Sequence, residues 1–566
     1  MPQSADMAAA REPARLGLAA SLGAVTVLAA TLFFFHLGVY GLWEPDEARY
    51  AEIAREMLAA RDFVVPHLNY VPYIEKPPLL YWLTACSFAI GGLNEFAARL
   101  VPATAALTTV IATWMFAARV FDYRRAMLAG AILATAPLFA VMAQVLTTDM
   151  LLTSFVTVSL FAFFLAWSEG GAWRWLLYIA MGLGTLTKGP VAIVIPAAVA
   201  IAFLIRQRDL RGGVSRLRPA SGALLTFAIA APWFLIVSRR EAGFAGFYFV
   251  GEHLHRFLDP NFEHAQALYF YVPVLILGFL PWSIILPLTV PLTGLFGRWK
   301  ASANRSARDF CLVAAAVIFG FFSLASGKLI PYVLPAFPPL AIAIADSVMS
   351  IEEHAGGSRR FAIAAMTTMA LIGALMLAAP FAGLSTPYLS LVRPALLAAG
   401  LIAIAGGAMA GLSIARGRVE AAPAIVVLAI AAALIAGSYG RLEAEPLRSY
   451  AGLCRTIAAQ APAGSTLICY RRYVQGLPYY NRQRIVLVGA PSELNFGMEH
   501  SEDAASWFLT TDDELFRLWD TRGPKVLVID ESDLERLRSR LGNFTTIASE
   551  GRKLAILRAE EQLGSN

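Results

Sequence analysis

Long apolar segments recur along the first 440 residues of this chain, and most are long enough to cross a bilayer as a helix. No other feature restricts the fold as strongly, because a backbone in lipid must satisfy its own hydrogen bonds, as helices and closed barrels do. The composition agrees, since hydrophobic residues make up 58% of the chain and charged residues 15%, against roughly 45–50% and 25% in soluble domains. The sequence therefore predicts a polytopic α-helical membrane protein.

The apolar segments predict about thirteen transmembrane helices. They cover residues 16–39, 97–120, 126–145, 150–167, 173–186, 191–205, 224–237, 269–296, 312–325, 332–348, 361–382, 391–414 and 421–436. The first is too long for a signal-peptide core. Arginine-rich loops such as 206–218 and 297–308 fall on the same side as Arg11 and Arg15 near the N-terminus. Because basic loops stay in the cytoplasm, the N-terminus is predicted to be cytoplasmic.

Residues 440–566 differ in composition from the membrane domain predicted for residues 1–439. Strand-like runs at 466–469, 485–488 and 526–529 alternate with helix-like segments at 512–519 and 532–541. This alternation predicts a small α/β domain, and the odd number of spans places it outside, in the periplasm. Cys454 and Cys469 both lie in it. They could form a disulfide in that oxidising compartment or remain two buried thiols.

A polar segment at residues 41–81 separates the first predicted span from the others. Glu44 and Pro45 mark a helix start, with Asp46 in the first turn. Asp46, Arg49 and Tyr50 then share one face of the helix, because their spacing is i, i+3 and i+4. The opposite face is apolar. The segment is therefore predicted to form an amphipathic helix against an apolar surface.

Other charged residues emerge at the external ends of the predicted spans. They are Lys76, Asp149, Lys188, Lys328 and the cluster at 252–256. Charges near membrane level are costly and usually mark a site, and lysines grouped on one side suit a phosphate. These charges also have structural explanations. Asp149 can cap a span, and the lysines can anchor at the membrane interface. The helix dipole likewise favours Asp46.

Two motifs in the polar segment point to a family. The run W-E-P-D-E-A-R-Y at residues 43–50 is followed by a tyrosine-rich loop and by E-K-P-P-L-L-Y-W at residues 75–82. The combination resembles the first external loop of bacterial lipid A aminoarabinose transferases, which are glycosyltransferase C enzymes related to the protein O-mannosyltransferases. The resemblance implies the glycosyltransferase C fold.

The resemblance also implies roles for individual residues. Asp46 and Asp149 are the expected catalytic carboxylates. Residues expected to bind the phosphate and sugar of the donor are Arg49, Tyr50, Tyr73, Lys76, Lys188, Lys328 and Tyr332. The resemblance allows, without requiring, a divalent ion such as zinc held by Glu75 and His255, with His253 the second choice. The two histidines cannot both face one ligand on a regular helix, and a structural histidine is an open alternative.

The predicted external site restricts the substrates. No nucleotide-binding glycine motif opens a predicted helix, so we expect no nucleotide or nucleic acid partner. A polyprenyl-phosphate sugar would be delivered through the membrane lipids instead. The resemblance implies transfer of 4-amino-4-deoxy-L-arabinose from undecaprenyl phosphate to a lipid A phosphate. The reaction would occur on the periplasmic face of the bacterial inner membrane and give polymyxin resistance.

Two alternatives remain at the level of the sequence. A transferase of the same architecture could move another polyprenyl-linked sugar to protein or to a different glycan. A transporter of lipid-linked sugars would also contain many spans and intramembrane charges. The lack of an evident inverted repeat and the one-sided distribution of charges argue against the transporter.

Overall fold

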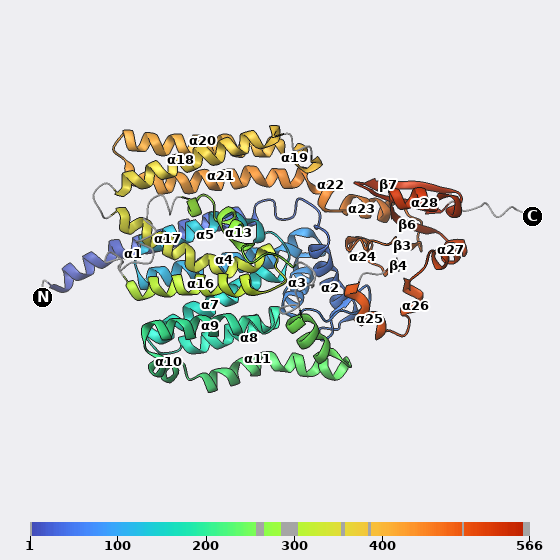
Figure 1. Ribbon diagram of the computed structural model, residues 1–566, viewed down its shortest axis with the longest axis horizontal. Coiled ribbons are helices and arrows are strands. Elements are labelled where there is room, and N and C mark those ends of the chain that lie inside the picture. The colour runs from blue at the N-terminus through green and yellow to red at the C-terminus, as the bar shows by residue number, and fades with distance from the viewer. Residues whose placement is uncertain are drawn as a thin grey trace, which may run out of the picture. The chain divides into compact units, whose positions relative to one another are not determined.

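The computed structural model describes residues 3–255, 265–284, 304–352, 357–382, 386–489 and 492–558. The chain divides into two compact units, drawn in Figure 1 and treated separately below. Unit 1 comprises Met1–Leu37, Leu100–Leu235 and Ala245–Gly440, and unit 2 comprises Gly38–Arg99, Ile236–Phe244 and Arg441–Asn566. The polar segment at residues 41–81 therefore belongs to the same unit as the C-terminal residues.

The described part of unit 1 is mainly helical. Within the described residues, nine helical segments of the chain are long and apolar enough to cross a membrane. They are α1 (Gln3–Phe34), α4 (Glu95–Val120), α7 (Thr148–Ser168), α11 (Pro219–Arg240), α16 (Arg305–Leu324), α17 (Phe337–Glu352) with the turn before it, α18 (Gly357–Ala378), α20 (Arg393–Ala415) and α21 (Ala422–Glu443). All nine coincide with predicted spans.

The remaining predicted spans coincide with shorter helices. These are α5 (Tyr123–Thr135) with α6 (Pro137–Met142), α8 (Trp173–Lys188), α9 (Val191–Gln207) and α13 (Tyr271–Gly278). Part of the predicted span 269–296 lies outside the described residues, so the total of thirteen stays a prediction. The span predicted at 126–145 is interrupted, because Ala136 precedes Pro137 and takes an extended conformation.

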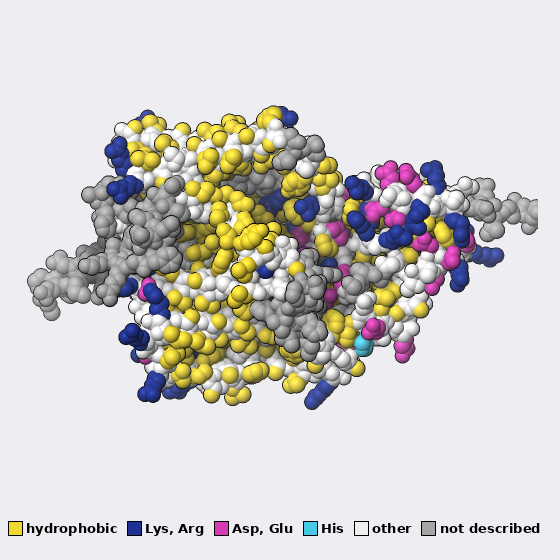
Figure 2. Space-filling view, in the orientation of Figure 1, with side chains coloured by type: hydrophobic (Ala, Val, Ile, Leu, Met, Phe, Trp, Pro, Cys, Tyr) yellow, Lys and Arg dark blue, Asp and Glu magenta, His cyan; other side chains and the backbone are white. Residues whose placement is uncertain are grey.

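The outer surface of unit 1 suits a lipid environment. Figure 2 shows hydrophobic side chains over its visible face, and Leu224, Phe227 and Leu235 of α11 are 72%, 62% and 59% exposed. Arginines gather at the end that carries α10 (Leu210–Leu217) and the start of α18. The exposed arginines there occupy positions 206, 208, 211, 216, 218, 359 and 360.

The C-terminal part of unit 2 contains a six-stranded sheet with the order β5-β4-β3-β6-β8-β7. The strands are β3 (Thr466–Tyr470), β4 (Val486–Val488), β5 (Phe508–Leu509), β6 (Lys525–Asp530), β7 (Phe544–Glu550) and β8 (Lys553–Arg558). The first four are parallel, and β7 and β8 form an antiparallel hairpin against β6. The predicted α/β architecture is confirmed, while the hairpin was not predicted.

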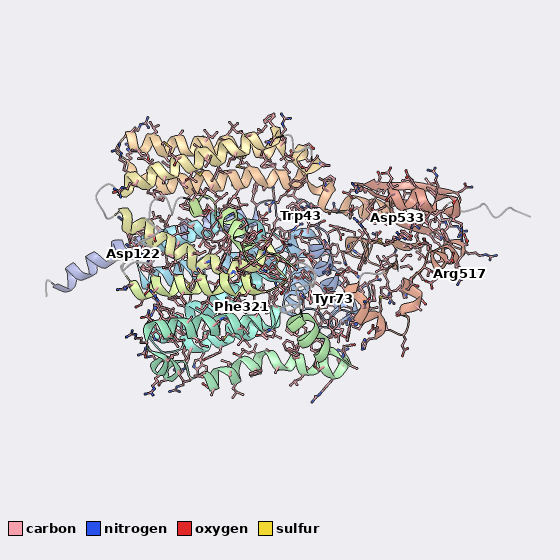
Figure 3. The ribbon with its side chains drawn as sticks, in the orientation of Figure 1. Trp43, Tyr73, Asp122, Phe321, Arg517 and Asp533 are labelled. Atoms are coloured by element: carbon pink, nitrogen blue, oxygen red, sulfur yellow. The ribbon has the colours of Figure 1, made fainter. Side chains whose placement is uncertain are left out.

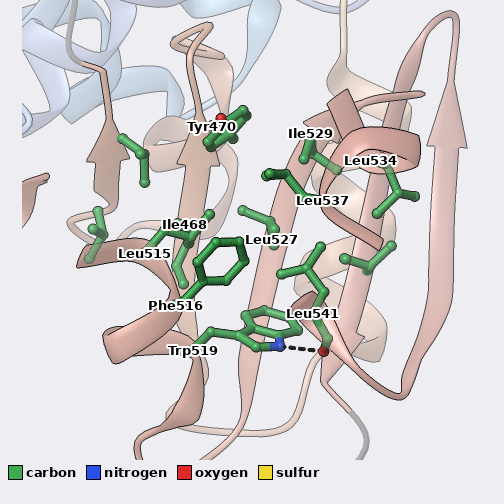
Figure 4. Packing of buried hydrophobic residues seen from close by; sticks show 13 residues of the cluster. Ile468, Tyr470, Leu515, Phe516, Trp519, Leu527, Ile529, Leu534, Leu537 and Leu541 are labelled. Carbon is green, nitrogen blue, oxygen red and sulfur yellow. Dashed lines mark hydrogen bonds between the residues drawn. The ribbon is translucent and has the colours of Figure 1, made fainter. Parts of the chain in front are cut away.

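Two helices cover one face of this sheet (Figure 4). They are α27 (Asp512–Asp520), which begins with a Thr511–Glu514 capping box, and α28 (Glu531–Leu541). Trp519 lies fully buried between them and donates from Nε1 to the Leu541 carbonyl at 2.9 Å. Cys454 and Cys469 are buried free thiols. Of the two states that the sequence allows for these cysteines, the structure contains the thiols.

The segment after the first span also folds within unit 2. It forms α2 (Asp46–Ala60), a hairpin of β1 (His67–Leu68) and β2 (Val71–Pro72), and α3 (Leu79–Gly91). The predicted helix is confirmed, but its apolar face is not the only face that is buried. Glu47, Glu52 and Glu56 are buried together with the apolar residues, because α24 (Gly476–Asn481) of the C-terminal part packs against α2.

Candidate functional site

The residues predicted from the sequence fall into two groups, one in each unit. The first-loop cluster in unit 2 consists of Asp46, Arg49, Tyr50, Tyr73, Glu75 and Lys76. The lysine cluster in unit 1 consists of Asp149, Lys188, Lys328 and Tyr332. Each cluster is described by itself.

Helix α2 places Asp46 and Arg49 one turn apart. Arg49 Nη1 lies 3.6 Å from Asp46 Oδ1, and the Asp46 side chain is 54% exposed. A carboxylate in the first turn of a helix is favoured by the positive end of the helix dipole. Tyr50 is buried, with its ring 5.9 Å from that of Tyr81. Asp46 therefore remains accessible on a firmly packed helix.

The turn before Pro77 holds the other half of this cluster (Figure 3 labels Tyr73). Tyr73 is buried and donates its hydroxyl to Glu75 Oε2 at 2.8 Å. Lys76 Nζ donates to the Glu75 carbonyl at 3.3 Å and lies 3.8 Å from Glu75 Oε2. Burial and the Glu75 charge raise the pKa of Tyr73, so its hydroxyl stays protonated. The turn is stiff because proline restricts the residue before it.

Three contacts of this cluster were not predicted from the sequence. Arg49 Nη2 lies 2.7 Å from Glu493 Oε2. Gln475 donates from Nε2 to Glu493 Oε1 at 2.7 Å and from its backbone N–H to Glu44 Oε2 at 2.9 Å. Glu493 and Gln475 lie in parts of the sequence without any motif that would have marked them.

A buried ion pair fixes the base of the first loop. Arg99 is fully buried and donates to both carboxylate oxygens of Glu47, at 2.9 and 2.7 Å. Its other donors reach the carbonyls of Tyr40 and Gly41 at 2.8 and 2.9 Å. A guanidinium suits this task because its planar fork bonds several acceptors in fixed directions.

The lysine cluster is built around an ion pair. Lys188, the last residue of α8, places Nζ 2.5 Å from Asp149 Oδ1 in the first turn of α7. The same Nζ lies 4.2 Å from the centre of the Tyr332 ring, which is a cation–π distance. Lys328 is buried and donates to the Gln266 carbonyl at 2.7 Å. The structure thus brings three of the four predicted residues together and gives Lys328 a carbonyl partner of its own.

The predicted metal ligands are only partly described. His253 and His255 belong to η1 (Gly246–His255), a π-helical segment, and their side chains lie outside the described residues. Glu75 Oε2 already accepts a hydrogen bond from Tyr73. The described residues contain no group of three or more His, Cys, Asp or Glu arranged to hold a metal ion. The predicted ligand set therefore stays a prediction.

Two family models match parts of this chain. Residues 75–236 match the model described as dolichyl-phosphate-mannose-protein mannosyltransferase. Residues 453–558 match the model described as aminoarabinose transferase C-terminal domain. The first match begins at Glu75 in the first-loop cluster, and the second covers most of the six-stranded sheet domain.

Similar proteins carry the name undecaprenyl phosphate-alpha-4-amino-4-deoxy-L-arabinose arabinosyl transferase. The one from Shewanella sediminis is 33% identical over 57% of this chain and 59% of its own length. Transferase 1 of Pseudomonas fluorescens is 32% identical over 65% of each. The match therefore spans less than two thirds of the length of either curated relative.

Solved structures extend the likeness to nearly the whole chain. The structure of ArnT from Cupriavidus metallidurans bound to undecaprenyl phosphate has a TM-score of 0.83 at 28% identity, covering 96% of this chain and 98% of that one. The apo structure of the same protein has a TM-score of 0.81. The expected fold, a multi-pass helical membrane domain of the glycosyltransferase C type with a C-terminal α/β domain, is confirmed.

Proposed function

We propose that this chain is an aminoarabinose transferase, which moves 4-amino-4-deoxy-L-arabinose from undecaprenyl phosphate to a phosphate of lipid A. The observation that carries the proposal is the first-loop cluster. The accessible carboxylate of Asp46 stands one helical turn from Arg49 on a packed helix. Two lines support the substrates: the relatives are named for this donor, and the similar ArnT structure contains undecaprenyl phosphate.

The reaction is a displacement at the anomeric carbon of the sugar. The bond from that carbon to the phosphate oxygen of undecaprenyl phosphate breaks, and the electron pair leaves with the phosphate. A lipid A phosphate oxygen forms the new bond. Arg49 and Lys76 are the cations of the first-loop cluster. We therefore assign to them the stabilisation of the negative charge that develops on the departing phosphate. The Tyr73 hydroxyl, bonded to Glu75 at 2.8 Å, holds the turn that carries Lys76.

The role of Asp46 follows from the chemistry of the acceptor. A lipid A phosphate is already anionic at neutral pH and needs little deprotonation, whereas a serine or threonine hydroxyl would need a general base. With a phosphate acceptor, Asp46 orients the sugar by binding its ammonium group and stabilises positive charge at the anomeric carbon. Its 54% exposed side chain leaves room for that contact.

We assign the site and the C-terminal domain to the periplasm and the N-terminus to the cytoplasm of the inner membrane. The exposed arginines around α10 support this orientation, because basic loops stay in the cytoplasm. Alkaline phosphatase fused after residue 558 should then be active in cells, and inactive when fused within the α10 segment. The opposite pattern would contradict the orientation.

Mass spectrometry of lipid A tests the function directly. A polymyxin-sensitive strain that lacks its own transferase would carry this protein, its Asp46→Asn variant or the control Asp513→Asn, whose side chain is 73% exposed in the sheet domain. We expect one added aminoarabinose, and resistance, with the unmutated protein and the control only. If inserted protein and available donor gave no addition, another acceptor would have to be sought.

No step of this mechanism uses a metal ion. We therefore expect transfer by the purified protein to survive dialysis against EDTA. Loss of activity on dialysis, restored by zinc, would instead assign a role to Glu75 and the histidines of η1.

A further inference from the structure

A chain of polar contacts links the first-loop cluster to the C-terminal domain within unit 2. It runs from Arg49 to Glu493 at 2.7 Å, from Glu493 to the Gln475 side chain at 2.7 Å, and from the Gln475 backbone to Glu44 at 2.9 Å. Glu44 precedes α2, which carries Arg49. The contacts therefore close a ring that begins and ends on the same short segment. We call these four residues the Arg49 ring.

The ring is largely shielded from water. Gln475 is 2% exposed, and the side chains of Arg49 and Glu493 are 13% and 19% exposed. Glu44 accepts a second hydrogen bond from the Gly476 N–H at 2.7 Å. In such a low-dielectric setting each contact is stronger than in water and each lost partner is costly. The ring therefore restricts where the guanidinium can lie.

Arg49 retains donor capacity beyond the ring. Its Nη1 lies at a longer 3.6 Å from Asp46, and its Nε is buried and has no hydrogen-bond partner among the described residues. Because a guanidinium is a rigid plane, a contact that holds Nη2 also restricts the directions in which Nε and Nη1 can point. Glu493 therefore helps to orient the remaining donors of Arg49.

We propose that Glu493 and Gln475 are positioning residues for the transfer reaction: they hold Arg49 so that its remaining donors meet the phosphate of the lipid-linked donor. The C-terminal domain then contributes positioning residues to the site. This inference rests on the function proposed above, in which Arg49 stabilises the departing phosphate. Neither residue touches the reacting atoms, and both act through Arg49.

The variants that separate positioning from a merely structural role are Glu493→Gln, Glu493→Asp and Gln475→Leu. Glu493→Gln keeps the shape and the acceptor for Gln475 but removes the charge that holds Arg49. Glu502→Gln is the matched control, because it makes the same change at an exposed position of the same domain. Full-length protein in nanodiscs would be assayed with undecaprenyl-phosphate aminoarabinose and lipid A.

We expect Glu493→Gln and Gln475→Leu to lower kcat/KM for the donor by about 10- to 100-fold, a range typical of a misaligned charged group, when each variant is assayed well below its own Tm. Glu493→Asp should recover part of the loss. In a double-mutant cycle, the kcat/KM of Arg49→Lys combined with Glu493→Gln should be no lower than that of Arg49→Lys alone. The reason is that both substitutions remove the same interaction between Arg49 and the phosphate.

Three results would overturn the inference while leaving the proposed function intact. The first is a wild-type kcat/KM in Glu493→Gln, and the second is a loss of kcat/KM that is fully explained by a lower Tm. The third is a double variant whose loss of kcat/KM is the product of the losses in Arg49→Lys and Glu493→Gln. If Glu493→Gln failed to fold, wild-type kcat/KM in Gln475→Leu would overturn it equally. An unmutated protein and a Glu502→Gln control that both fail to transfer would contradict the function itself, and the inference with it.

Discussion

The ammonium of Lys188 lies 2.5 Å from the carboxylate of Asp149, joining the last residue of α8 to the first turn of α7. The sequence suggested separate roles for them, a catalytic carboxylate and a phosphate-binding lysine. Their pairing makes them one unit whose charges largely cancel. A lysine neutralised in this way contributes less to binding an anion than an unpaired one would.

The pair predicts an asymmetry between single and double variants. Asp149→Asn or Lys188→Met alone leaves an uncompensated charge in a poorly hydrated place, while the double variant removes both charges. We expect each single variant to have a lower Tm than the double variant. Thermal unfolding in detergent measures this. The exposed pair Arg119 and Glu169 is the control, since such pairs contribute about 0–1 kcal/mol. Simple addition of the two single effects would contradict the prediction.

Lys76 offers a test of donor binding. Its side chain is 16% exposed and it lies beside Glu75 in the turn before Pro77. If Lys76 contacts the donor phosphate before and during reaction, Lys76→Ala removes binding in both states. We expect the KM for the lipid-linked donor to rise by about tenfold or more and kcat to fall as well, because the departing phosphate carries more charge in the transition state than in the bound donor. Wild-type KM in a folded Lys76→Ala protein would exclude the contact.

The elements predicted well from the sequence are those with local signals. The long spans and the strands β3, β4 and β6 are continuous apolar runs, and α2 is marked by its first turn and its periodicity. The span at 126–145 was predicted as one helix because its apolar character continues across Pro137. There the missing N–H of proline and the conformation of Ala136 interrupt the helix.

The candidate site was predictable only where its members are close in sequence. Asp46 and Arg49 are helical neighbours, so their contact follows from the i, i+3 spacing. Glu493 and Gln475 reach Arg49 and Glu44 from more than 400 positions away. A single sequence has no local pattern that encodes such a pairing. The burial of the charged residues of α2 was missed for the same reason, because the covering elements come from the end of the chain.

The contacts of Arg99 predict that even a conservative substitution at this position will lower the stability of the protein. Arg99→Lys keeps the charge but cannot satisfy both Glu47 oxygens and the carbonyls of Tyr40 and Gly41 at once. A lost hydrogen bond to a charged group costs about 1.5–3 kcal/mol, so we expect a clearly lower Tm and faster proteolysis of the first loop. Arg119→Lys, at an exposed pair, is the matched control. Equal stability of the two variants would show that the Arg99 contacts are dispensable.

Glu44 predicts how stability changes with pH. Burial raises its pKa from 4.5 to about 7, even though the N–H groups of Gly476 and Gln475 favour the charged form. Because folding favours the protonated carboxyl, its stabilising contribution is present below pH 4.5 and is lost as the pH rises through 7. Glu44→Gln resembles the protonated form and cannot titrate. We therefore expect the Tm of the unmutated protein, measured relative to Glu44→Gln, to fall between pH 5 and pH 8. The exposed Glu502→Gln substitution should leave that pH dependence unchanged. A constant difference between the unmutated protein and Glu44→Gln across this range would mean that the Glu44 carboxylate is ionised throughout and is held by its two N–H donors.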